Sequence, residues 1–396
     1  MPVKRVFLHL GMSKSGSTSI QNALFHNAAI LEKNSFRYLT EWDENHLVKF
    51  KSLFSPYHIV NRKRINDHFV KKMLNVITTT DCETLILSGE YSYHLWHNTT
   101  VENIKQFIEN YFQTNGIEVT IIFIVRNPLT WFISFMQQRL FKSGFLMNKN
   151  EDFFEVAIKQ YKGVLNLKKY FPDSIKLIKF EDACLDKNGL VGVFLREVHF
   201  PEELLKSIIF KRQNESRCME VMEFIYYIEA TEPRYPYVNN SRSNPNRFRT
   251  DLMCLKDIRG VKFDLPYQSK VELWERLQET VHLLKGNTGI DYTDYSISNI
   301  AEQETYSEQT IQEFVDIFPK LNFVLQKHFL KFFEKKYMET AQVKFKQLHF
   351  KDSIPWGIYN HKNAFISILY LRIQNMAYKI IPRKIKKTLR GLLGRS

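Results

Sequence analysis

The chain has 396 residues, 44% of them apolar and 14% aromatic, which allows a sizeable core and excludes the low-complexity and disordered classes. Its net charge of +14 is concentrated at one end, because residues 341–396 hold twelve Lys or Arg and one acid while the remainder is close to balance. That asymmetry predicts a localised anionic partner rather than a basic fold.

The four cysteines lack metal or redox spacing and indicate reduced thiols. No apolar run approaches the roughly 18 residues of a membrane span, and no secretory signal precedes the first apolar run, so we expect a cytoplasmic protein.

Four short apolar runs predict β-strands, at residues 6–10, 84–88, 119–125 and 176–180. Their apolarity is continuous rather than alternating, which is typical of strands buried on both faces of a parallel sheet. Helical patterns separate the runs, at residues 18–32, 101–111, 132–141, 152–162 and 190–197. The predicted fold class is α/β, a doubly wound parallel sheet flanked by helices.

Strand patterns fade after residue 210. Helical patterns continue at residues 217–229, 269–284 and 309–335, and residues 233–250 have the composition of a loop. We therefore expect a core over residues 1–215, a helical and loop part over residues 216–340 that completes a binding site, and a basic tail over residues 341–396.

The first predicted strand runs into "GMSKSGSTS", residues 11–19, and then into a helical pattern. Gly11 and Gly16 have the spacing of a phosphate-binding loop, and such a loop lies where open parallel sheets bind ligands. Lys14 and the hydroxyls of Ser17 and Thr18 would add charged and polar contacts. An ATP-binding loop needs a lysine after the second glycine, where this chain has Ser17. The alternative is an ordinary turn with a solvated lysine.

A second polar cluster, "RNPLTWFIS", follows the strand predicted at residues 119–125. Arg126 leaves the carboxyl end of that strand, and Ser134 lies eight residues later on a predicted helix. A guanidinium at this edge suits a second phosphate. A salt bridge for Arg126 and a helix-surface position for Ser134 are the alternatives.

Together the two clusters resemble the sulfotransferase family that uses 3′-phosphoadenosine-5′-phosphosulfate (PAPS). "SKSGSTS" is similar to that family's 5′-phosphosulfate loop, usually Lys-Thr-Gly-Thr-Thr, with serines here in place of two threonines. "RNPLTWFIS" is similar to its 3′-phosphate motif, an arginine and a serine eight positions later. "LIKFEDACLDKNGLVGVFLREV" resembles a further segment of the family, an acidic pair after a strand, and the resemblance covers about residues 3–215. It implies a P-loop-like sulfotransferase fold in which the donor is bound by Ser13, Lys14, Ser15, Gly16, Ser17, Thr18, Ser19, Arg126 and Ser134.

The resemblance also implies a mechanism without a catalytic metal. Lys14 would stabilise the bridging oxygen that leaves with the phosphate, since sulfuryl transfer places charge on that oxygen. The base that accepts the acceptor's proton is expected after the strand at residues 84–88, as Glu90 or His94. A carboxylate at a helix start and a partly buried polar ring are the alternatives for these two residues. His9, inside a strand, fits a core histidine better than a catalyst.

The basic tail predicts a partner for the chain's end. Residues 364–396 combine an apolar helical stripe with dense Lys and Arg, which is typical of a helix on an anionic membrane surface. Packing of this segment on the body is the alternative, and nucleic acid is disfavoured because the body lacks a basic stripe. With the polar aromatic loop at residues 233–250, the tail predicts a peripheral enzyme at the inner membrane face, of bacterial carbohydrate type, that sulfates a carbohydrate or glycolipid.

Two other functions remain open from the sequence. One is a nucleotide-dependent kinase or NTPase with a degenerate phosphate loop. The other is a non-catalytic protein that binds membrane surfaces.

Overall fold

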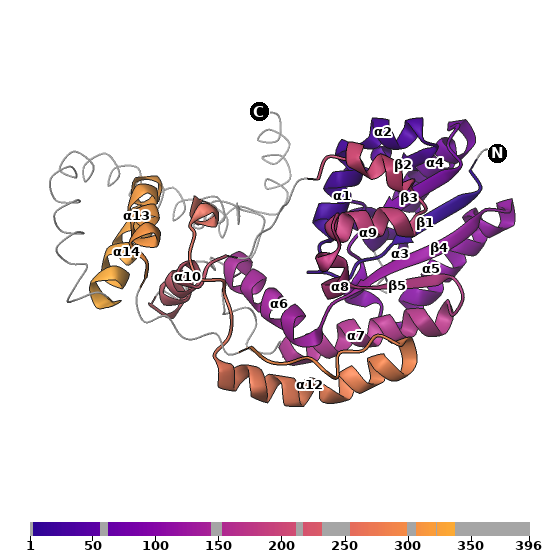
Figure 1. Ribbon diagram of the computed structural model, residues 1–396. Helices are drawn as coiled ribbons and strands as arrows, with labels where there is room; N and C mark the ends of the chain where they lie inside the picture. The colour runs from indigo at the N-terminus through magenta and orange to yellow at the C-terminus, as the bar shows by residue number, and fades with distance from the viewer. Residues whose placement is uncertain are drawn as a thin grey trace, which may run out of the picture. The chain divides into compact units, whose positions relative to one another are not determined.

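The computed structural model describes residues 3–55, 62–143, 153–210, 217–231, 254–298, 306–321 and 323–336. The chain divides into two compact units (Figure 1). The first comprises residues 1–140, 147–216 and 262–303, and the second residues 141–146, 217–261 and 304–396. The loop predicted at residues 233–250 and the tail at residues 341–396 lie outside the described residues.

The first unit contains a five-stranded sheet in the order β2-β3-β1-β4-β5, with every neighbouring pair parallel. Its strands are β1 (Arg5–His9), β2 (Phe36–Tyr38), β3 (Thr84–Ser88), β4 (Glu118–Val125) and β5 (Ile175–Lys179). The parallel α/β fold is confirmed. Because β1 lies between β3 and β4, the segments that follow these three strands meet at one edge of the sheet.

Helices cover both faces of the sheet, as the doubly wound prediction requires (Figure 1). Side chains alternate along β1, so that Val6 and Leu8 join one hydrophobic cluster while Phe7 joins another. Residues of α5 and α7 pack in the first cluster, and residues of α1 and α9 in the second. The helices of this unit are α1 (Ser17–His26), α2 (Ala28–Lys33), α3 (Leu47–Phe54), α4 (Arg62–Thr79), α5 (Asn98–Tyr111), α6 (Pro128–Ser143, up to residue 140), α7 (Phe153–Tyr170), α8 (Phe180–Leu185), α9 (Gly189–Glu197) and α12 (Tyr267–Thr288).

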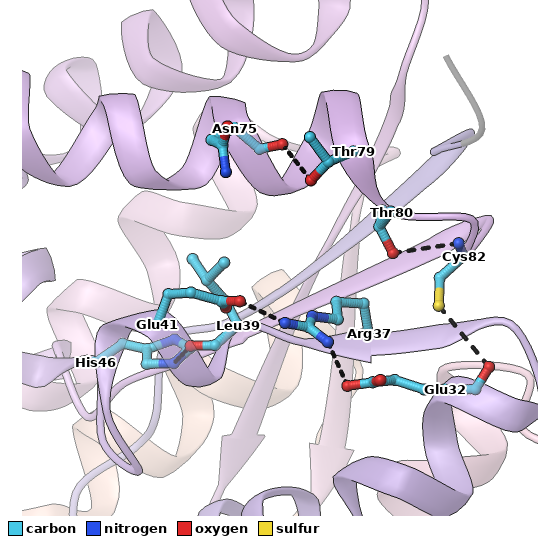
Figure 2. A network of polar contacts seen from close by, with 9 residues as sticks. All are labelled: Glu32, Arg37, Leu39, Glu41, His46, Asn75, Thr79, Thr80 and Cys82. Atoms are coloured by element: carbon cyan, nitrogen blue, oxygen red, sulfur yellow. Dashed lines mark hydrogen bonds and ion pairs between the residues drawn. The ribbon is translucent and has the colours of Figure 1, made fainter.

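The edge strand β2 is held by a polar network (Figure 2). The Arg37 guanidinium pairs with Glu32 at the end of α2 and with Glu41 in the following 3₁₀ turn, Thr40–Trp42. His46 lies next to this network, where its Nε2 is 3.0 Å from the Leu39 carbonyl. Its backbone N–H donates to Ser88 O, and its Nδ1 accepts from Ser88 N. His46 therefore joins the segment after β2 to the carboxyl end of β3.

The second unit is helical in the part that the structure describes, which agrees with the predicted helical additions. Its helices are α10 (Met219–Thr231), α13 (Glu308–Ile317) and α14 (Phe323–Lys336). Phe224, Phe314 and Phe329 form an aromatic cluster, with ring centroids 5.6–6.2 Å apart. No helix among the residues described in either unit has the length and apolarity needed to cross a membrane.

Candidate functional site

The loop between β1 and α1 has three residues with left-handed backbones: Gly11 (φ 110°), Lys14 (φ 63°) and Gly16 (φ 80°). Gly16 needs glycine for its conformation, and a Cβ there would lie 2.4 Å from Leu190 Cδ2, so that side chain would also have to shift. Lys14 adopts the same conformation with a full side chain, at a cost of roughly 1–2 kcal/mol. The rest of the fold must therefore stabilise the loop.

Part of that stabilisation comes from inside the loop. Ser15 and Ser17 are buried, and both hydroxyls donate to the Met12 carbonyl, from Ser17 Oγ over 3.0 Å. Ser13, Thr18 and Ser19 are half-buried around them. The two buried hydroxyl protons thus hold the loop's own backbone.

The backbone amides at the start of α1 form the polar surface of the loop. Gly16 is the N-cap and provides no side-chain cap. No side chain of a described residue caps the first amides of α1. The first amides of a helix have no acceptor in the preceding turn of that helix, and next to left-handed residues they favour an anion.

The segment after β3 lies against this loop. The amides of Gly89 and Tyr91 donate to the carbonyls of His9 and Leu10, each over 2.9 Å. A Cβ on Gly11 would lie 3.6 Å from the Cα of Glu90, which places this half-buried carboxylate residue beside the loop. The structure therefore brings the phosphate-loop candidate and one base candidate together.

His94 lies farther along the same segment, at the end of the 3₁₀ turn Ser92–His94. Its half-buried ring is 5.9 Å from that of Tyr91. Burial lowers the pKa of His94, and the neighbouring His97 and Lys51 lower it further. A neutral imidazole at pH 7 is able to accept a proton.

Arg126 meets the loop from the carboxyl end of β4. Its Nη1 donates to the Lys14 carbonyl over 2.6 Å, its Nε donates to Thr130 Oγ1 over 3.1 Å, and its Cζ lies 4.8 Å from the Phe180 ring centroid. Burial lowers the pKa of Arg126, and the nearby Glu181 raises it. Ser134 is half-buried on α6, and no hydrogen bond joins it to Arg126 among the described residues.

Glu181, on α8, organises the backbone around Arg126. Its Oε1 accepts from Asn127 N over 3.0 Å and from Thr130 Oγ1 over 3.1 Å, and the Tyr292 hydroxyl donates to its Oε2 over 2.9 Å. Burial and Glu181 raise the pKa of Tyr292, so that its phenol stays protonated. Sequence analysis gave these residues no role. The available signal was the acidic pair directly after β5.

His9 lies in the core, as its position in a strand indicated. Its side chain is fully buried, with Nδ1 2.7 Å from Ser88 Oγ, and burial lowers its pKa to about 3. In the described ranges, no three His, Cys, Asp or Glu residues form a group that could hold a metal ion.

Several solved structures are similar to this chain. A sulfotransferase from Alicyclobacillus acidocaldarius covers 61% of this chain and 98% of its own, with 12% identity and a TM-score of 0.34. The sulfotransferase domain from the curacin biosynthetic pathway covers 70% and 98%, with 15% identity and a TM-score of 0.29. Retinol dehydratase, in complex with androsterone and the inactive cofactor PAP, covers 74% and 84%, with 14% identity and a TM-score of 0.30.

The chain is similar in structure to sulfotransferases. No protein-family model and no curated protein matches it. At identities of 12–15%, this likeness assigns no role to any individual residue.

Proposed function

We propose that this protein is a sulfotransferase that moves a sulfuryl group from PAPS to a hydroxyl or amine of a carbohydrate or glycolipid acceptor. The observation that carries the proposal is the junction of the loop at residues 11–16 with Arg126, where the guanidinium lies 2.6 Å from the Lys14 carbonyl. PAPS carries a phosphosulfate at the 5′ position and a phosphate at the 3′ position of one adenosine. Two adjoining anion sites at one sheet edge suit that donor.

The 5′-phosphosulfate fits the start of α1. The amides of residues 15–18 supply donors, and the positive end of the helix dipole favours the negative charge. Lys14, held beside these amides, supplies a full positive charge. Ser15 and Ser17 support the site by fixing the Met12 carbonyl.

The 3′-phosphate fits Arg126. Two sides of its guanidinium are bound to Lys14 O and Thr130 Oγ1, and Nη2 makes no hydrogen bond with a described residue. An arginine whose Nε and Nη1 are fixed in this way is well placed to bind a phosphate through Nη2. We assign Ser134, by the motif spacing, to the same phosphate.

Transfer then proceeds in line. The acceptor oxygen or nitrogen attacks sulfur, the bond from sulfur to the bridging oxygen breaks, and adenosine 3′,5′-bisphosphate (PAP) leaves. Lys14 stabilises the charge that develops on the bridging oxygen. Glu90, or His94 in its place, takes the acceptor's proton, a contribution of about 10²–10⁴-fold in rate.

The acceptor and the location are proposed from two segments of the sequence. They rest on the polar aromatic sequence at residues 233–250 and on the basic amphipathic sequence at residues 364–396. The second of these supports a cytoplasmic enzyme held at the inner face of a membrane.

The test is a thermal-shift comparison of nucleotides on the whole chain. PAP at 100 times its Kd should stabilise the protein by about 2.7 kcal/mol, and ATP with Mg²⁺ should not. Stabilisation by ATP with Mg²⁺ in preference to PAP would support the kinase or NTPase instead. If no nucleotide stabilises the chain, the result would favour a non-catalytic protein that binds membrane surfaces.

The Arg126→Ala variant is the control for the site. It should lose most of the shift with PAP while its own Tm stays measurable. An unchanged shift would remove Arg126 from the donor site.

A further inference from the structure

The backbone of Ser13 and Lys14 is held by side chains from two other segments. The Ser13 amide donates to Ser92 Oγ over 3.1 Å, and the Ser13 carbonyl accepts from Trp131 Nε1 over 2.8 Å. The next carbonyl, that of Lys14, accepts from Arg126. Both peptide units that flank the Lys14 Cα are therefore fixed through their carbonyls.

Fixing a carbonyl also fixes an amide. In a trans peptide the C=O and the following N–H point in opposite directions. Trp131 reaches the first of the two carbonyls from α6, and Arg126 reaches the second from the residue after β4. The amides of Lys14 and Ser15 therefore point away from that side. A left-handed Lys14 between two such peptide units produces the backbone concavity that binds anions.

The packing around Trp131 fixes the orientation of its hydrogen bond to the Ser13 carbonyl. The side chain is fully buried, and its ring stacks on Phe135 with centroids 4.9 Å apart and an interplanar angle of 12°. It also meets Tyr161 edge to face at 6.3 Å. A ring that is packed on these sides cannot turn its N–H away from the loop.

We propose that Trp131 is a positioning residue of the 5′-phosphate site: through the Ser13 carbonyl it holds the loop amides toward the anion. This inference rests on the proposed function, because it concerns the same donor. It predicts that loss of the indole N–H weakens binding of the 5′-phosphate and spares the 3′-phosphate.

The experiment compares Trp131→Phe with Trp42→Phe in the whole chain. Trp42 is the matched control, since it is equally buried and its Nε1 donates to a carbonyl, that of Phe69, over 3.1 Å. Calorimetry measures the affinity for PAP, which has both phosphates, and for adenosine 3′-phosphate, which has only one. Both variants should lose a similar amount of Tm, because each loses one buried hydrogen bond.

The expected result is specific to one variant and one ligand. Trp131→Phe should bind PAP about tenfold more weakly, the effect of one buried hydrogen bond, and adenosine 3′-phosphate unchanged. Trp42→Phe should bind both as the wild type does. Equal losses for the two ligands, or equal PAP affinity in the two variants, would overturn the inference.

A second variant covers the case in which Trp131→Phe does not fold. Ser92→Ala removes the partner of the Ser13 amide and should show the same preferential loss of PAP affinity. If the wild type itself binds PAP no better than ATP with Mg²⁺, the proposed function fails and this inference falls with it.

Discussion

The backbone of Lys14 has a positive φ of 63°, a conformation that glycine would adopt without cost. A lysine at such a position opposes the local energetic preference of the backbone. The charge of the side chain beside the helix start gives a reason for that cost.

Replacement of Lys14 should separate activity from stability. Lys14→Ala keeps the left-handed strain, so its free energy of unfolding should stay within about 1 kcal/mol of the wild type. Lys14→Gly should be at least as stable as Lys14→Ala, since the strain is relieved. The rate of sulfuryl transfer, measured as release of PAP from PAPS, should fall by about 10²–10³-fold in both variants. That is the typical cost of losing one charge-stabilising group.

Urea unfolding and initial rates measure the two quantities in parallel. An alanine variant that keeps full turnover would contradict the assigned role. A glycine variant less stable than the alanine variant would contradict the argument about strain.

Sequence patterns located the residues of this edge that belong to short motifs. Gly11, Lys14 and Arg126 each follow a buried strand, and strand order then brings them together. Trp131 and Tyr292 could not be found in this way, and the acidic pair after β5 pointed to Glu181 without showing its partners. Ser13 and Trp131 are 118 residues apart and Glu181 and Tyr292 are 111 apart, so only the folded chain shows their bonds.

At the scale of elements, the errors of prediction have local causes. The strand β2 was missed because it has three residues and Arg37 at its centre, too little for an apolar run. The helix predicted over residues 309–335 is interrupted by the 3₁₀ turn Phe318–Lys320, which contains Pro319. The helix predicted over residues 18–32 is divided at Asn27, between α1 and α2.

Asn27 interrupts that helix through a distant contact. Its Nδ2 donates to Ala23 O over 2.7 Å and to Ile209 O over 3.1 Å, and its Oδ1 accepts from Ile209 N over 2.9 Å. Asn27 thus ends α1 and bonds this end of the helix to Ile209, which is 182 positions away in the sequence.

Asn27→Ala should therefore cost about 2–3 kcal/mol in free energy of unfolding, since it removes three hydrogen bonds at about 1 kcal/mol each. Asn34→Ala is the matched control, because Asn34 Nδ2 makes the equivalent bond to Ile30 O, four residues back, over 2.8 Å. That change should cost about 1 kcal/mol or less. Equal losses in urea unfolding would mean that the contact with residue 209 contributes nothing.

At the scale of the whole molecule, the chain returns to its first unit after leaving it. Residues 262–303 belong to that unit although residues 217–261 do not. The α12 side chains Leu277, Val281 and Leu284 lie in the same hydrophobic cluster as Leu8 of β1. Helical periodicity predicted α12, but periodicity alone carries no information on which core a helix joins.

Two buried histidines of the first unit tie its stability to pH. Burial lowers the pKa of both His9 and His46 to about 3, while in the unfolded chain each titrates near 6.5. Between these values the unfolded state binds more protons, so acid favours unfolding. Each histidine should lower the free energy of unfolding by about 1.4 kcal/mol per pH unit as the pH falls below 6.5.

Urea unfolding between pH 7 and pH 5, followed by tryptophan fluorescence, measures this slope. The series stops at pH 5 so that the titration of carboxylates does not add to the slope. Arg196 lowers the pKa of Asp186, for example, so the contribution of that carboxylate to stability is lost only at more acidic pH. His9→Asn or His46→Asn should reduce the slope by one histidine's share, whatever it does to stability at pH 7. If neither buried substitution alters the slope, these rings are protonated in the folded protein and the core must accommodate their charge.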